Sequence, residues 1–257
     1  MVLFVASLSG CSLIRGGIAY FQSLDSFNEL GSDSGIFYEE GERNIARMVE
    51  QHIYEAVKIV EQKQYKPFRE KVAIYICASK ESFSKYSGAP KMARGAVFNN
   101  KLFISPRASE TNTLIQILVH ELSHLHFHQY VGNRRYASNI PPWFQEGLAV
   151  YVSGGGGAEK VLYGAAKESI LKNHSFRPND SGSLIFPKTA FSFGLKPHMF
   201  YRQASMFVSY LSKNSPVEFK EFVTMLLGDA EFKVAFEKAF NKSIDIAWVD
   251  FVDTLKA

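Results

Sequence analysis

Apolar residues in the N-terminal half of the chain recur with two different periods, one helical and one extended. Residues 42–64 carry them every three to four positions, which predicts a long amphipathic helix with one face toward the core. Apolar runs near Ile36–Tyr38 and over Val72–Ala78 are shorter and predict buried strands. The positions expected on the core face of the helix are Ile45, Met48, Val49, Ile53, Ala56, Val57 and Val60.

Two local signals add a short helix and a hairpin to this half. Ser79 precedes a segment that reaches about Tyr86, and serine is a preferred residue at a helix N-cap. Residues 96–105 contain two apolar runs separated by Asn99 and Asn100. Because asparagine tolerates left-handed backbone, this segment predicts a β-hairpin that turns at the two asparagines.

The C-terminal half has helical periodicity almost throughout. Gly154–Gly157 interrupts it as a flexible joint rather than a phosphate-binding loop, because no Lys-Ser/Thr pair follows. Residues 175–198 have no periodicity and predict a long surface loop. The chain is therefore expected to be α+β, with a small mixed sheet and helices followed by an all-helical half. The helices are expected at about 112–130, 142–153, 158–173, 199–213, 216–228, 230–240 and 244–256.

The composition is that of an ordinary globular protein. The 257 residues are 46% hydrophobic and 21% charged, which excludes a disordered or collagen-like chain. The formal charge is only +4, and the 29 Lys and Arg residues are spread along the chain, which argues against nucleic-acid binding. No stretch after residue 20 has the ~18 consecutive apolar residues of a membrane-spanning helix, so we expect a soluble body.

The first twenty residues are expected to be a lipoprotein signal and linker. Residues 2–8 are apolar and are followed by small residues, as in a cleaved export signal. Leu8-Ser9-Gly10-Cys11 resembles the bacterial lipobox, which implies that Cys11 is lipidated and anchors the protein on the non-cytoplasmic side of the cell envelope. No Lys or Arg precedes the run, so the alternative is an apolar N-terminus that frays or packs in the core. Cys77 lies in an apolar run and is interpreted as a small buried hydrophobe.

His120-Glu121-Leu122-Ser123-His124 has the HExxH pattern within an apolar helical segment. Four positions are about one helical turn, so His120 and His124 share a face, ~6 Å apart along the axis, and can bind one Zn²⁺. Glu121 is rotated by about 100° from His120, where it can reach a water on the metal without binding the metal itself. Four of the seven histidines lie within 120–128, which favours a metal site over an exposed helix face with incidental histidines.

A third ligand is required, and Glu146 is the best candidate. His128 is ~12 Å along the helix from His120, too far to share an ion, and His126 points elsewhere, so both are interpreted as packing or rim residues. The segment Pro141–Tyr151 starts a second helix after a loop of about ten residues, which can bring Glu146 opposite the two histidines. A His₂Glu set leaves a fourth position open, as in catalytic zinc sites. The alternative is that Glu146 is only a first-turn helix acid.

HELSH, followed 22 positions after His124 by the Glu146 of PPWFQEGLAVY, resembles the gluzincin zinc metallopeptidases, specifically the peptidase MA-like family. The resemblance covers about residues 95–210, with a looser likeness to the C-terminus. It implies one Zn²⁺ per chain, bound by His120, His124 and Glu146, with Glu121 as the catalytic base. The longer HExxHxxGxxH pattern of astacin-like enzymes is absent, because Phe and Tyr occupy its Gly and His positions.

The same resemblance implies a domain organisation. Residues 21–257 are expected to form one zincin-like peptidase domain. Its α/β half is expected at 21–131 and contains the HExxH helix, and its helical half is expected at 132–257. The active-site cleft is expected between the two halves.

A fifth site residue follows from related aminopeptidases, in which a tyrosine at a helix start donates a hydrogen bond to the tetrahedral oxyanion. Tyr201 holds the comparable position in Tyr-Arg-Gln-Ala-Ser, which opens the helix expected at 199–213. Gln203 and Ala204 replace the Lys-Gly pair of that motif. The alternative is a helix-face tyrosine that packs on the core.

Two departures from the family pattern affect the expected activity. Val150 stands where many gluzincins have an Asp that orients a zinc ligand, so another group or a backbone carbonyl must do so here. Gly95–Asn99 is the nearest analogue of the segment that captures the substrate amine in aminopeptidases, but Phe98 replaces its Glu. An endopeptidase, or an enzyme with an unusual substrate, is therefore favoured. The Leu102–Ser105 strand is expected to bind an extended peptide by β-addition, as an edge strand can.

Three functions are consistent with these residues. The first is a zinc-dependent metallopeptidase of the cell envelope, with peptide or protein substrates and a membrane contact only through the anchor at Cys11. The second is a non-catalytic zinc-bearing domain that binds envelope proteins or peptidoglycan. The intact Glu121 argues against it, because a site without catalysis needs no base. A weaker third hypothesis is a hydrolase that acts on a non-peptide amide.

Overall fold

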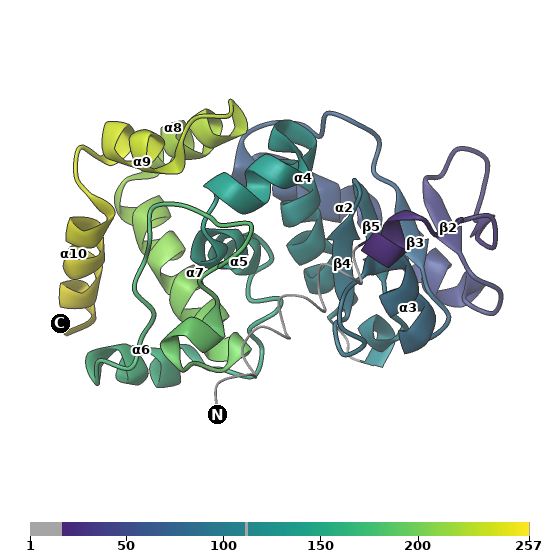
Figure 1. The fold of residues 1–257 in the computed structure, drawn as a ribbon, viewed down its shortest axis with the longest axis horizontal. Coiled ribbons are helices and arrows are strands. Elements are labelled where there is room, and N and C mark those ends of the chain that lie inside the picture. Colours follow the sequence, from purple (N-terminus) through teal and green to yellow (C-terminus); the bar gives the residue numbers. More distant parts are fainter. Residues whose placement is uncertain (1–16, 111–112, 257) are drawn as a thin grey trace. The chain divides into compact units, whose positions relative to one another are not determined.

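The computed structural model describes residues 17–110 and 113–256 (Figure 1). The expected signal, its lipobox and Cys11 lie outside the described residues. The described residues form two compact units. The first contains the chain up to Val57 together with Glu70–Leu125, and the second contains Lys58–Arg69 together with the chain from His126 onward. The α+β class is confirmed, because the sheet belongs to the N-terminal half and the C-terminal half is helical.

The first unit is built on a five-stranded sheet with the order β1-β2-β3-β5-β4. The two outer pairs, β1 with β2 and β4 with β5, are antiparallel, and the two inner pairs are parallel. β1 lies in a Ser- and Gly-rich segment for which no strand was predicted. The strands are β1 (Asn28–Glu29), β2 (Ile36–Tyr38), β3 (Ile74–Ile76), β4 (Gly95–Phe98) and β5 (Lys101–Ile104).

The predicted hairpin and helix cap are both confirmed. β4 and β5 are joined at Asn99 and Asn100, which have φ values of 47° and 56°. Ser79 caps α3 (Lys80–Ser87) in a capping box, its hydroxyl accepting a hydrogen bond from the Ser82 amide.

The expectation that the Leu102–Ser105 strand is a sheet edge is wrong. β5 lies between β3 and β4, so both of its hydrogen-bonding edges are used within the sheet. The outer strand on this side is β4, the first strand of the hairpin. Strand β4 is therefore the one that can accept an added strand here.

The inner strands are buried on both faces, as is usual for parallel strands. Tyr75 and Phe103 stack at 5.3 Å on one face and join a cluster with Phe83 and Tyr86. Cys77 belongs to the same cluster and has no exposed surface, so its interpretation as a small hydrophobe is confirmed. On the other face the fully buried side chains are Ile74, Ile76, Leu102 and Ile104.

Two long helices run from the first unit into the second. In α2 (Arg43–Gln64) the fully buried hydrophobic residues are Ala46, Val49, Ala56 and Val60. Met48 was expected on this core face, but its side chain is 42% exposed. At about 100° per residue it points well to the side of the stripe that Ala46, Val49, Ala56 and Val60 form. The second long helix is α4 (Leu114–Asn139).

α4 differs from the sequence expectation at its C-terminal end. A loop of about ten residues was expected before the next helix, whereas α4 resumes after a single break at Gly132, which has φ 74° and ψ 156°. Glycine adopts this conformation at little cost, so the chain changes direction at one residue and remains helical to Asn139. Only Ile140 and Pro141 then separate α4 from α5.

The second unit is a helical assembly (Figure 1). Aromatic rings fill much of its core. Trp143 contacts Phe144, Phe207 and Phe232 with ring centroids 5.3–5.8 Å apart. The expected loop at 175–198 contains a short 3₁₀ helix, η2 (Ala190–Phe193), and the helix expected at 158–173 is shorter. The helices are α5 (Pro142–Val152), α6 (Tyr163–Leu171), α7 (Pro197–Asn214), α8 (Pro216–Leu227), α9 (Phe232–Phe240) and α10 (Ile244–Lys256).

The four-glycine segment after α5 forms a turn that favours glycine. Gly154, Gly155 and Gly157 have φ values of 68°, 116° and 88°. The turn also caps the C-terminal end of α5, because Gly155 N–H donates a hydrogen bond to the Val150 carbonyl at 2.9 Å. Among the described helices, none combines the length and the apolar character needed to cross a bilayer.

Candidate metal centre

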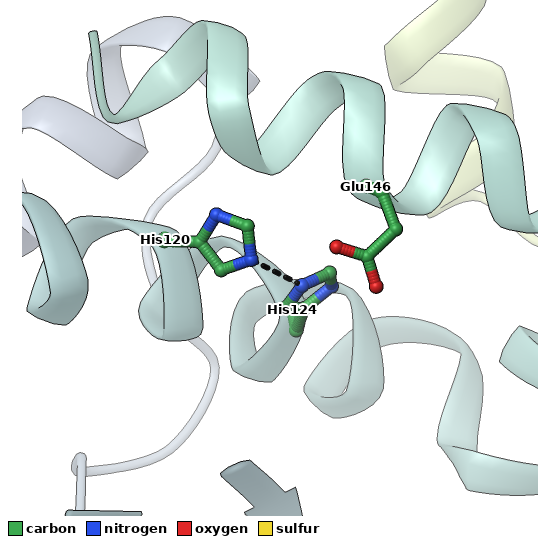
Figure 2. Close-up of side chains that lie close together, drawn as sticks. All are labelled: His120, His124 and Glu146. Carbon is green, nitrogen blue, oxygen red and sulfur yellow. Dashed lines mark hydrogen bonds between the residues drawn. The ribbon is translucent and has the colours of Figure 1, made fainter. Parts of the chain in front are cut away.

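Helix α4 holds the two HExxH histidines one turn apart with their rings facing a common point. The Nε2 atoms of His120 and His124 are 3.2 Å apart, and the ring centroids are 5.0 Å apart (Figure 2). His120 is buried and His124 is half-buried. This arrangement follows directly from the helical spacing that the sequence predicts.

The separation of the two nitrogens fits a tetrahedral zinc ion. Two Zn–N bonds of ~2.0–2.1 Å at a tetrahedral angle place the nitrogens about 3.3 Å apart. Two neutral imidazoles this close can form only one hydrogen bond with each other, whereas a divalent cation uses a lone pair of each. The donor atoms of His120 and His124 therefore fit Zn²⁺ in both kind and spacing.

Helix α5 adds a carboxylate to the two histidines. One ligand atom from each of His120, His124 and Glu146 lies within 4.8 Å of the other two. In Figure 2 the Glu146 carboxylate points toward the imidazoles from a neighbouring helix. The three predicted ligands are thus brought together as a group that could hold a metal ion, and two nitrogens with one carboxylate leave a further coordination position open.

The position of α5 is fixed by close packing next to Glu146. Pro142 occupies its first turn, where a missing N–H costs nothing. A Cβ on Gly147 would come within 2.9 Å of the backbone of Ala204 on α7, so only glycine allows this approach. Trp143, one turn before Glu146, is buried and donates from Nε1 to the Asn179 carbonyl at 2.8 Å.

The C-terminal end of α5 is held by a lysine from α2. Lys63 Nζ donates to the carbonyls of Val152 at 3.0 Å and Tyr151 at 3.4 Å, two of the groups that a helix end leaves without helical partners. Burial lowers the pKa of Lys63, and its ammonium also lies 5.3 Å from the centre of the Tyr151 ring. Sequence reasoning missed this contact, because nothing in a helical pattern links position 63 to positions 151 and 152.

Glu121 follows His120 on α4, and its side chain lies against strand β4. A Cβ on Gly95 would come within 2.6 Å of Glu121 Cγ and 3.0 Å of Oε1. Gly95 is buried and does not have a positive φ. Glycine is therefore needed here because a side chain would not fit, and not because the backbone conformation requires it. In the sequence, Gly95 is notable only as part of the segment compared with a substrate-binding one, and no local pattern predicts its contact with Glu121.

The other two histidines of the cluster are structural. His126 has no exposed surface, donates from Nε2 to the Lys66 carbonyl at 3.0 Å, and contacts the Phe68 ring edge-on. Burial lowers its pKa to about 4, so the ring is neutral at physiological pH. His128 is hydrogen-bonded to Asn133, and burial lowers its pKa as well. Their interpretation as packing residues agrees with these contacts.

Tyr201 lies in the first half of α7 and is half-buried. Residues three apart on a helix share a face, so Tyr201 is on the side of α7 where Ala204 packs against Gly147 of α5. The neighbouring Arg202 fixes this end of α7, donating from Nε to the Val161 carbonyl at 2.9 Å and from Nη2 to the Ala158 carbonyl at 3.1 Å. Burial lowers the pKa of Arg202.

A comparison with protein-family models and a comparison with curated proteins both find no match to this chain.

Proposed function

We propose that this chain is a zinc-dependent metallopeptidase that hydrolyses peptide bonds in the cell envelope. The observation that carries the proposal is the group formed by His120, His124 and Glu146, with the ligand atoms within 4.8 Å of one another and Glu121 beside it. A metal site that only stabilises a fold is usually closed by four protein ligands, whereas a His₂Glu set is the arrangement of a catalytic zinc site.

In this proposal the three ligands hold one Zn²⁺. When bound, the ion supplies Lewis acidity, which lowers the pKa of water and polarises a carbonyl group. The ion would be held by the nitrogens of His120 and His124 and by the carboxylate of Glu146. The close packing of the neighbouring Gly147 and Trp143 keeps that carboxylate in place.

Glu121 is proposed as the general base. Its carboxylate takes a proton from the attacking water and then transfers it to the nitrogen of the leaving amine, which balances the proton over the cycle. The contact with Gly95 supports this role, because it restricts where the carboxylate can lie. Tyr201 is proposed to donate its phenolic hydrogen to the oxyanion that develops on the substrate carbonyl.

The peptide substrate is proposed to bind along β4. This outer strand begins at Gly95, beside Glu121. Among the described strands none pairs with its outer edge, which can pair with an extended peptide backbone. Phe98 offers no carboxylate to bind a free α-amine, which favours cleavage within a peptide over removal of its first residue. The envelope location rests on the likeness of Leu8–Cys11 to a lipobox.

The first test is the metal content of the purified chain, measured by elemental analysis for the wild type, Glu146→Ala and Glu168→Ala. We expect one zinc per chain in the wild type and in Glu168→Ala, whose exposed carboxylate forms an ion pair with Lys172 at 2.6 Å. We expect weaker retention in Glu146→Ala during dialysis against a chelator. A folded, zinc-supplied wild type without zinc would overturn the proposal.

The second test separates catalysis from binding. Glu121→Gln removes the base and keeps the shape of the side chain, so we expect it to retain zinc and to lose at least 10²-fold in turnover on peptides that the wild type cleaves. Activity equal to that of the wild type would exclude Glu121 as the base. A fully zinc-loaded wild type that cleaves nothing in a broad peptide library would favour the non-catalytic binding domain.

A further inference from the structure

The loop between α6 and α7 exposes three consecutive large apolar side chains. Leu184, Ile185 and Phe186 are 48%, 67% and 81% exposed, and Phe191 on η2 is 80% exposed. Single exposed apolar residues are ordinary, but a contiguous run of them indicates contact with another apolar phase. Elsewhere in the helical unit, Leu162 and Tyr163 form an exposed pair, and Val217, Val234 and Ile246 are exposed without an exposed apolar neighbour in the sequence.

The two ends of this loop are fixed on the helical unit. Gly182 N–H donates to the Asn139 carbonyl at 3.1 Å, and a Cβ on Gly182 would clash with the backbone at the end of α4. On the other side, Ala190 and Leu195 are buried. Residues 183–189 therefore form a loop that is held at both ends. The backbone of this loop places its apolar side chains in solvent.

The sequence around the loop is basic. Residues 181–217 contain no Asp or Glu. Lys188 and Lys196, two and ten positions after Phe186, are both exposed. The acidic residue just before this stretch, Asp180, lies 3.7 Å from the ammonium of Lys233. An apolar run bordered by lysines complements a surface that is apolar inside and anionic outside, which is what an anionic phospholipid bilayer presents.

We propose that residues 184–191 are a membrane-contacting loop that inserts Leu184, Ile185 and Phe186 into the interfacial region of an anionic bilayer, while Lys188 and Lys196 contact the headgroups. This contact requires no metal and is independent of the proposed peptidase activity. It adds a second membrane contact to the anchor expected at Cys11, and two weak signals together hold a protein on a membrane more stably than one.

The test measures partition onto vesicles of phosphatidylcholine with about 30% phosphatidylglycerol, using full-length Cys11→Ser so that no lipid is attached. The loop variant replaces Leu184, Ile185 and Phe186 with serine. The control replaces the three exposed residues Val217, Val234 and Ile246 with serine and so removes as many apolar side chains from the same unit. We expect at least a tenfold loss of partition for the loop variant and less than a twofold loss for the control. All variants keep the same N-terminal residues, so the difference between them reports on the loop.

A second readout locates the loop directly. In Phe186→Trp the new indole is exposed, whereas Trp143 and Trp248 are buried and report little on lipid. We expect brominated lipids in the same vesicles to quench the added fluorescence. Replacing Lys188 or Lys196 with Gln should lower partition roughly fivefold each on anionic vesicles and leave it unchanged on phosphatidylcholine alone.

Three results would overturn the proposal: equal partition of the loop and control variants, absence of quenching in Phe186→Trp, or a loss confined to the binding of peptide substrates. The last result would assign the loop to substrate recognition instead. Because vesicle partition is measured without zinc and without a substrate, its outcome is independent of whether the chain is a peptidase.

Discussion

The Cα of Gly95 lies directly against the side chain of Glu121, so close that a Cβ at position 95 would come within 2.6 Å of Glu121 Cγ. Gly95 begins the outer strand β4, and Glu121 follows the first histidine of HExxH on α4. The strand proposed to bind the substrate therefore also limits the position of the proposed base. This contact links two parts of the mechanism that the sequence motif describes separately.

Replacing Gly95 with Ala is expected to impair catalysis more than folding. The backbone at Gly95 suits any residue, so the new methyl group is accommodated by moving the Glu121 side chain. We expect unchanged zinc content and a loss of about 10–10² in kcat/KM. Gly31→Ala is the control, because a Cβ there has nothing within 4 Å. Wild-type activity in Gly95→Ala would show that the contact does not position the base.

Much of the fold could be predicted from the sequence because its signals are local. The capping serine Ser79, the turn at Asn99 and Asn100, and the periodicity of α2 each depend on a few neighbouring residues. The positions of His120 and His124 followed from helix geometry alone. Their proximity to Glu146 was predicted from the joint pattern, and the structure brings these three side chains together.

The features that escaped prediction depend on contacts between distant segments. Either strand of the β4–β5 hairpin could have joined β3, and only tertiary packing decides that β5 does and that β4 is outermost. The sequence could not show whether the helix ends at Gly132 or continues after it, because the residues around Gly132 are compatible with both a helix and a loop. Lys63 is an ordinary helix residue in sequence, and its role at the end of α5 arises only from the fold.

Gly147→Ala is expected to destabilise the helical unit and to weaken zinc binding together. The new Cβ would lie 2.9 Å from backbone atoms of Ala204, which cannot move as a side chain can. We expect the free energy of unfolding to fall by about 1–3 kcal/mol, and zinc affinity to fall because Glu146 is the preceding residue. Gly164→Ala in α6, where a Cβ meets nothing within 4 Å, should be neutral or slightly stabilising. Denaturant unfolding of the two variants distinguishes them, and equal stabilities would contradict the close packing of α5 on α7.

Cys77 is expected to be unreactive in the folded protein. It has no exposed surface, and desolvation raises its pKa, so the nucleophilic thiolate is absent at neutral pH. In a Cys11→Ser background we expect labelling by a disulfide reagent at pH 8 to be at least 10²-fold slower in buffer than in guanidinium. Rapid stoichiometric labelling without denaturant would contradict the burial of this residue.

The same raised pKa makes the stability of the fold fall at high pH. Cys77 keeps its proton when folded but releases it when unfolded above about pH 9, so the stability is full below that pH and declines above it. The slope is at most about 1.4 kcal/mol per pH unit for one group. Urea unfolding at pH 8 and pH 10 should show a smaller decline in Cys77→Ala than in its parent. An equal decline in both proteins would assign the pH dependence to other groups.

His126→Ala is expected to reduce stability without removing the metal. The ring is completely buried between Phe68 and Tyr130, with centroids 5.0 Å away in each case, and Nε2 binds the Lys66 carbonyl. Losing this packing and the hydrogen bond should cost about 2–4 kcal/mol of unfolding free energy. Because His126 is not among the residues that converge with Glu146, zinc content in the folded fraction should stay at one per chain, whereas His124→Ala should lose it. Elemental analysis after gel filtration makes the comparison, and loss of zinc from folded His126→Ala would mean that the ligand set differs from the one assigned to α4 and α5.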